Sequence, residues 1–100
     1  MKKGWIVTGD KITKQNDKGN YVSIPVKIIG PRGCKLTEKE LRNGHPFKMF
    51  DDVGNLYYTG FLVGDKTSED GFFPLEHYGE PNAGCTYIQY KNDKGEWETL

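Results

Sequence analysis

The sequence lacks any long run of hydrophobic residues, and its 100 positions include only two cysteines, Cys34 and Cys85. A membrane-spanning helix needs about 20 consecutive apolar residues, so we expect none here. Two cysteines are too few for the dense disulfide framework of small secreted domains, and we expect both thiols to be free. Thr8, Gly9 and Asp10 interrupt the apolar segment that would follow a basic signal-peptide start. These absences predict a cytoplasmic protein without a secretion signal.

The usual motifs of metal and nucleotide sites are also missing. Zinc sites are typically built from closely spaced pairs of ligands. Here the only Cys and His residues are separated by 11, 32 and 8 positions, and they are Cys34, His45, His77 and Cys85. No G-x-x-x-x-G-K-[ST] or G-x-G-x-x-G element is present to hold a phosphate group. The segment that begins at Asp51 lacks the glycine and glutamate spacing of a calcium-binding loop. We therefore expect no metal and no cofactor.

Charge is balanced over the whole chain but not along it. The 14 basic and 14 acidic side chains cancel. Residues 1–50 contain 11 of the basic and 4 of the acidic residues, which gives +7, so residues 51–100 carry −7. Such asymmetry can mark a face directed at a charged partner. The simpler interpretation, which we favour, is that the two halves interleave in one sheet and neutralise each other.

Three similar four-residue segments predict three β-hairpins. Asn16-Asp17-Lys18-Gly19 recurs unchanged as Asn92-Asp93-Lys94-Gly95, and Asp51-Asp52-Val53-Gly54 has the same form. The Asn or Asp side chain at the first position bonds to the backbone two residues on, and glycine at the fourth position adopts a positive φ without a Cβ clash. This combination closes a hairpin loop. The predicted strand pairs are 5–13 with 21–29, 47–51 with 56–63, and 86–91 with 96–100.

Residue patterns place two of these strands in the sheet. Apolar residues occupy alternate positions of segment 21–29, which predicts one buried face. Pro25 cannot donate a ladder hydrogen bond, so it predicts an edge strand or a bulge. Segment 56–63 is apolar on both faces, which indicates a central strand. Gly60 in its middle predicts a bulge or close packing by another element.

One short helix is predicted over residues 37–43. Thr37 is a good N-cap, and Glu40, three residues on, completes a capping-box pattern. Asn43-Gly44 then provides a stop for the helix. The expected fold is a single α+β domain over residues 1–100, made mostly of antiparallel β-hairpins with about six strands.

Residues 64–85 show no clear period. We expect an exposed loop over 64–71, a short apolar anchor over 72–75, and a single helical turn that begins at Pro74 and runs through Tyr78. A long aperiodic stretch in a small domain is often functional. This segment is therefore the first place to look for a site.

The chemistry of a Cys-His enzyme is represented in the same segment by Cys85, His77 and Asn82. Their closeness in sequence says little about their geometry, and a buried cysteine at the start of a strand is the commoner arrangement. We therefore expect that the protein is not an enzyme. A small enzyme that uses Cys85 and His77 is retained as an alternative.

The six tyrosines and two tryptophans favour a binding function, because these residues are enriched at interfaces. The expected function is a small non-enzymatic binding or adaptor module whose partner is another protein. The candidate anchors are Tyr78, Tyr87 and Trp97, which lie in or beside segment 64–85 and have the side chains that dominate binding hot spots.

A second binding hypothesis is a single-stranded nucleic-acid-binding small β-barrel. Such proteins stack bases on sheet aromatics within a basic groove. The zero net charge, the two arginines and the absence of an RNP-like run count against it. A stripe of basic residues that crosses exposed aromatics would favour it.

The C-terminal half of the chain contains the pattern F-x-x-x-D-D-x-G-x-x-Y-Y-x-G over residues 47–60 and P-N-A-G-C-T-x-I-x-Y over residues 81–90. In these segments it resembles small uncharacterised proteins of bacteria, phages and other mobile elements, from which it departs at Thr59, where that group has an acidic residue. The resemblance covers roughly the last 55 of the 100 residues. It implies a bacterial or phage cytoplasmic protein, and it implies no activity and no site residue.

Overall fold

Six antiparallel strands form one sheet in the order β2-β1-β4-β3-β5-β6 in the computed structural model, which describes residues 3–100. The strands are β1 (Gly4–Gln15), β2 (Tyr21–Gly30), β3 (His45–Phe50), β4 (Leu56–Val63), β5 (Tyr87–Lys91) and β6 (Trp97–Thr99). The pairs β1–β2, β3–β4 and β5–β6 are hairpins. The predicted α+β class with about six strands is confirmed. Within residues 3–100, every helix is too short or too polar to cross a membrane.

Each predicted turn closes its hairpin with a left-handed glycine. Their φ angles are 80°, 90° and 80° for Gly19, Gly54 and Gly95. Each of these amides donates to the carbonyl three residues earlier, at 3.0 to 3.2 Å. In each turn the side chain of the first residue accepts a hydrogen bond from the amide two residues on. The turn prediction is confirmed in its mechanism as well as its position.

The placement of β2 and β4 also agrees with the sequence. β2 is an outer strand, and its register with β1 shifts between Ile28 and Pro25, so Pro25 lies both on an edge strand and beside a bulge. β4 lies between β1 and β3. Gly60 of β4 packs so tightly that an added Cβ would collide with the carbonyl oxygen of Ile6 and lie 2.7 Å from Cζ of Phe47.

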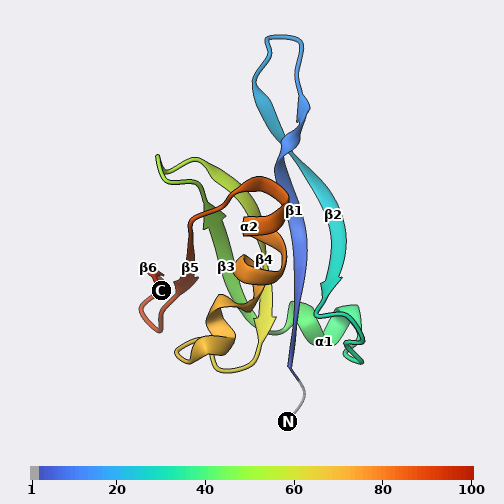
Figure 1. Ribbon diagram of the computed structural model, residues 1–100, viewed down its shortest axis with the longest axis vertical. Coiled ribbons are helices and arrows are strands. Elements are labelled where there is room, and N and C mark those ends of the chain that lie inside the picture. The colour runs from blue at the N-terminus through green and yellow to red at the C-terminus, as the bar shows by residue number, and fades with distance from the viewer. Residues whose placement is uncertain (1–2) are drawn as a thin grey trace.

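One face of the sheet is covered by a helical segment that runs from Glu69 to Ala83 (Figure 1). It consists of η1 (Glu69–Phe72), the π-helical η2 (Leu75–Gly79) and α2 (Glu80–Ala83). The expected loop is therefore found over residues 64–68, but the helical segment begins at Glu69 and extends on both sides of the expected single turn from Pro74 to Tyr78. The segment changes from 3₁₀ to π to α pitch, so its apolar residues cannot recur with one fixed period.

The main core lies between this helical segment and the sheet. Its buried members are Trp5, Val7, Phe47, Met49, Tyr58, Leu62, Leu75, Cys85, Ile88 and Tyr90. The Tyr90 hydroxyl donates to the carbonyl of Gly71 at 2.8 Å and ties the sheet to the helical segment. Gly79 allows close approach, because a Cβ there would lie 2.6 Å from Sδ of Met49.

The short helix α1 (Glu38–Arg42) covers one end of the second face of the sheet. The Thr37 side chain accepts a hydrogen bond from the Glu40 amide, and the Glu40 side chain accepts one from the Thr37 amide, so the predicted capping box is confirmed. α1 packs against β1 and β4. Its cluster combines Ile6, Leu36 and Leu41 with partly buried neighbours.

The distal halves of β1 and β2 extend beyond the core as an arm (Figure 1). This arm accounts for the elongated shape, whose extents are 45 × 26 × 25 Å. The Asp10 carboxylate interrupts the pairing near the base of the arm, because it accepts hydrogen bonds from the amides of Ile12 and Thr13. The arm therefore departs from the sheet at an irregular stretch of β1.

Candidate functional site

The part of the second face formed by β3, β5 and β6 lies outside the contacts of α1 with β1 and β4. We call this surface the open face. Strand alternation, together with the burial of the intervening residues on β3 and β5, places on it the side chains of Lys48, Phe50, Tyr87, Gln89, Lys91, Trp97 and Thr99. All of these are partly or fully exposed. The side chains that alternate with them on β3 and β5 are in the main core, so the open face stands on a rigid support.

Aromatic rings occupy both ends of the open face. Phe50 and Tyr87 are opposite each other on neighbouring strands, and their rings stack with centroids 5.0 Å apart and planes 12° apart. Trp97 lies opposite Lys91. The ammonium nitrogens of Lys48 and Lys91 lie 4.2 Å and 5.8 Å from the centre of the Trp97 ring, within the range of cation–π attraction.

Polar groups lie between these aromatic positions. Gln89 is opposite Lys48 on one side and opposite Thr99 on the other, and its Nε2 donates to Oγ1 of Thr99 at 3.2 Å. The open face therefore presents rings at two ends and hydrogen-bonding and cationic groups in the middle. Cross-strand aromatic pairs also stabilise sheets by roughly 0.2–1 kcal/mol each, so the rings contribute to the fold as well.

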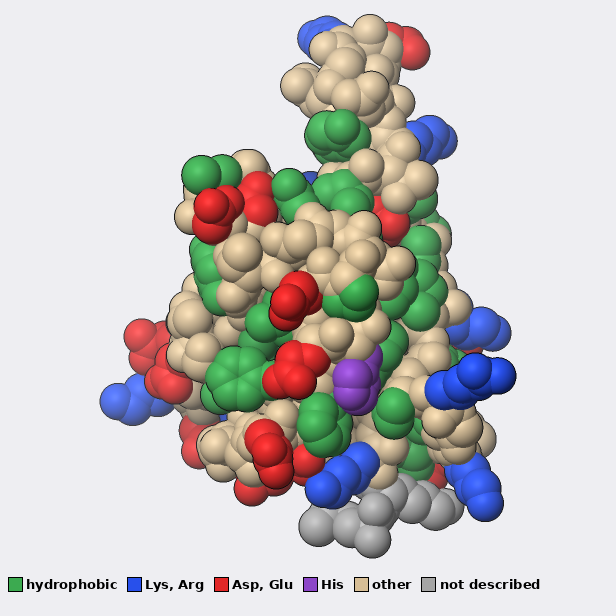
Figure 2. Space-filling view, in the orientation of Figure 1, with side chains coloured by type: hydrophobic (Ala, Val, Ile, Leu, Met, Phe, Trp, Pro, Cys, Tyr) green, Lys and Arg blue, Asp and Glu red, His purple; other side chains and the backbone are tan. Residues whose placement is uncertain are grey.

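Charge differs between the two sides of the molecule. The helical segment contains Glu69, Asp70, Glu76 and Glu80 but no Lys or Arg, and Figure 2 looks onto this side and shows its acidic groups. Among described strand residues directed toward the open side, none is Asp or Glu. The expected neutralisation occurs between Lys3 and Asp70, at 3.0 Å. On the α1 side, Glu38 pairs with both Lys27 and Arg42.

The three candidate anchors predicted from sequence do not form one patch. Tyr87 and Trp97 share the open face. Tyr78 lies in the helical segment on the opposite side, with ring centroids 5.8 Å from Trp5 and 5.0 Å from Tyr58. Its burial raises the pKa of its hydroxyl. Sequence reasoning missed Phe50, although the predicted hairpins and strand alternation could have placed it on the side of β3 away from Phe47.

The residues of the alternative Cys-His site are engaged separately. Burial raises the pKa of the Cys85 thiol to about 11, so it stays protonated near neutral pH. His77 stacks on Phe73 at 5.1 Å, and its Nδ1 accepts a hydrogen bond from Nε1 of Trp5 at 3.2 Å. Asn82 donates to the carbonyl of Tyr78. No hydrogen bond within residues 3–100 joins His77 to Cys85.

Cys34 and Cys85 are both free thiols, and they belong to different hydrophobic clusters. In the described part of the chain, no three Cys, His, Asp or Glu side chains come together as a group that could hold a metal ion.

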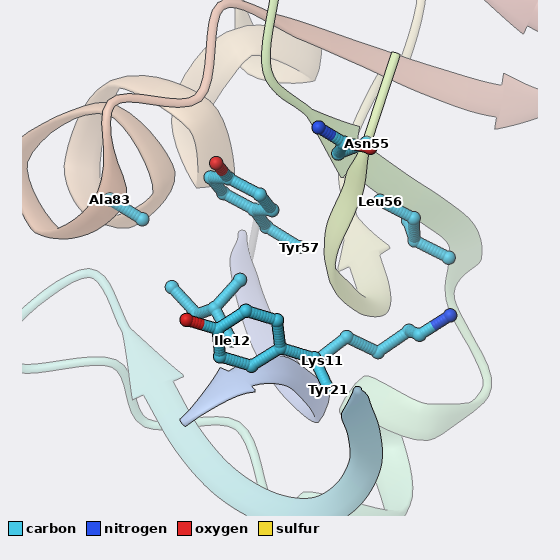
Figure 3. Close-up of a pocket in the computed structure, with 7 residues that line it drawn as sticks. All are labelled: Lys11, Ile12, Tyr21, Asn55, Leu56, Tyr57 and Ala83. Atoms are coloured by element: carbon cyan, nitrogen blue, oxygen red, sulfur yellow. The ribbon is translucent and has the colours of Figure 1, made fainter. Parts of the chain in front are cut away.

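A cleft of about 550 Å³ lies between the arm and the start of β4. Its lining residues, shown in Figure 3, are Lys11, Ile12, Tyr21, Asn55, Leu56, Tyr57 and Ala83. Asn55 donates to the Asp51 carboxylate at 2.9 Å. Hydrogen bonding to the same carboxylate raises the pKa of Tyr57. Lys11 extends away from both tyrosine rings (Figure 3), so the polar groups of the cleft do not converge on a common point.

Comparison of the chain with protein-family models, with curated proteins and with solved structures finds no match. The choice among surfaces therefore depends on their own chemistry. The open face combines exposed rings with cations on a rigid sheet, whereas two polar side chains of the cleft, Asn55 and Tyr57, are already hydrogen-bonded to Asp51.

Proposed function

We propose that the protein is a small non-enzymatic binding module and that the open face is its binding surface. The observation that carries this proposal is the presence of three partly exposed aromatic rings. Phe50 and Tyr87 lie on strands whose other side is core, and Trp97 lies on the neighbouring edge strand β6. Aromatic side chains supply most of the energy at many interfaces. Because the sheet already fixes their positions, little conformational entropy is lost when a partner binds.

Two classes of partner suit such a face. The richness in Tyr and Trp favours a protein, whose pockets would receive the rings. The lysines require that the segment in contact be anionic, so a protein partner would offer an acidic segment, and a single strand of nucleic acid would offer phosphates. The resemblance to bacterial and phage proteins leads us to propose the cytoplasm as the place of action.

A site-specific photo-crosslinker tests the proposed surface. Placed at Gln89, in the middle of the open face, it is expected to yield a discrete adduct in the native cytoplasm. The matched control is the same group at Glu76, an exposed position on the helical side, and it should yield little adduct. Equal adducts from both positions, or none from Gln89, would contradict the proposal. Nuclease treatment of the adduct reports the class of partner.

A further inference from the structure

We propose that the occupant of the open face is a single strand of nucleic acid. Bases would stack on Trp97 and on the Phe50–Tyr87 pair, and phosphates would contact the ammonium groups of Lys48 and Lys91. This inference rests on the proposed function, because it names the partner of the same surface. It uses the general chemistry of single-strand binding, in which stacking platforms alternate with cations along a groove or sheet.

The spacing of the rings suits an extended chain. Trp97 is opposite Lys91, and Tyr87 lies four residues from Lys91 on β5. At about 3.3 Å per strand residue the two stacking positions are therefore ~13 Å apart along β5. The space between them is occupied by Gln89 and its cross-strand neighbour Lys48. Two bases of one strand could therefore stack on the two aromatic positions while the sugar–phosphate backbone that joins them passes over the polar centre.

The charges of the open face favour the same occupant. Neither Lys48 nor Lys91 takes part in an ion pair with a described residue. By strand alternation Glu98, which pairs with the core residue Tyr90, points to the opposite side from Trp97, and it accepts a hydrogen bond from Asn92 there. The acidic helical side would repel phosphates, so a nucleic-acid strand would be directed to the open face.

A protein partner is less complementary to the Trp97 ring and the two lysine ammonium groups beside it. A pocket that receives the Trp97 ring would also remove water from the two ammonium groups beside it, and burying an unpaired charge is costly. Such a partner would need carboxylates at both positions around an apolar pocket. A nucleic-acid strand carries flat rings and anionic phosphates in every unit, so it satisfies the rings and the lysines together.

Fluorescence anisotropy with labelled oligothymidylate and oligouridylate tests the proposal and shows whether DNA or RNA is preferred. The wild-type protein should bind at least one of them. On a log–log plot, affinity should fall with salt with a slope of about −1.4, from about −0.7 for each of two contacted phosphates. Trp97 fluorescence should be quenched on binding. The Trp97→Phe variant should bind without that quenching change, since Trp5 is buried.

Variants separate stacking from charge. Tyr87→Ala and Trp97→Ala should each weaken binding about tenfold, the effect expected from loss of one stacked base. Lys48→Gln should reduce the salt slope by about 0.7. The matched controls are Tyr21→Ala and Lys18→Gln on the arm, which remove the same side chains elsewhere and should leave affinity unchanged. Circular dichroism establishes that each variant is folded.

The outcomes distinguish this inference from the proposed function. If neither oligonucleotide binds at low salt, or if the arm variants weaken binding as much as the open-face variants, the inference is overturned. A nuclease-resistant adduct at Gln89, together with binding of polyglutamate in place of oligonucleotides, would identify an acidic protein partner. That result would leave the open face as the binding surface. Oligonucleotide binding without any adduct at Gln89 would instead overturn the surface itself.

Discussion

Replacing Gly60 with alanine is expected to destabilise the protein by on the order of 3–5 kcal/mol, a large share of the ~5–15 kcal/mol that holds a typical domain folded. The new methyl group would collide with the carbonyl oxygen of Ile6 in β1 and approach Cζ of Phe47. Backbone atoms of a neighbouring strand cannot rotate away as a side-chain terminus can. Relief therefore requires separation of β1 from β4 at the centre of the sheet.

Denaturant unfolding followed by circular dichroism measures this effect. The control is Gly95→Ala, which adds the same methyl group where nothing lies within 4 Å, at a left-handed φ of 80°. Strain at that turn should cost about 1–2 kcal/mol. If the two substitutions cost the same, the close packing of β1 on β4 described above is incorrect.

Phe47 and Phe50 lie three positions apart on β3. Replacing Phe47 with alanine should reduce stability far more than replacing Phe50. Phe47 is 1% exposed and contacts Tyr90 edge-on in the main core, so Phe47→Ala should lower the unfolding free energy by about 3–5 kcal/mol. Phe50 is partly exposed and stacks only on the open face, so Phe50→Ala should lower it by about 0.5–1.5 kcal/mol.

Binding should respond in the reverse order. Phe50→Ala removes one half of a stacking platform and should weaken oligonucleotide binding, whereas Phe47→Ala, measured where it is folded, should change it little. Denaturant unfolding measures the stability of the two variants, and fluorescence anisotropy measures their oligonucleotide binding. If Phe50→Ala costs as much stability as Phe47→Ala and binding is unaffected, the Phe50 ring serves only the packing of the sheet.

The hairpins and the first helix could be predicted because their signals are local. A turn needs Asn or Asp and a glycine three positions later, and a capping box needs Thr37 and Glu40; both kinds of signal fit within four residues. The order of the strands has no such signal, because β1 pairs with β4 and β3 pairs with β5 across long separations. Of the helical segment over 69–83, only the turn from Pro74 to Tyr78 was predicted, because the pitch of the segment changes along its length.

The candidate site was predicted in part for a related reason. Tyr87 and Trp97 could be selected from their side-chain type and their strand positions. Whether a ring is exposed depends on which face the helical segment covers, and that is a property of the tertiary fold. Tyr78 was therefore selected although it packs on Trp5, and Phe50 was passed over although it stands beside Tyr87.

Mapping of amide chemical shifts in ¹⁵N-labelled protein, during titration with the oligonucleotide that binds more tightly, tests the central claim most directly. The open-face account predicts that the perturbed signals belong to β3, β5 and β6, with the indole N–H of Trp97 among the largest. Signals from residues 69–83 on the acidic side should stay in place. Perturbations centred on the helical segment or on the arm, with β5 and β6 unaffected, would contradict the account.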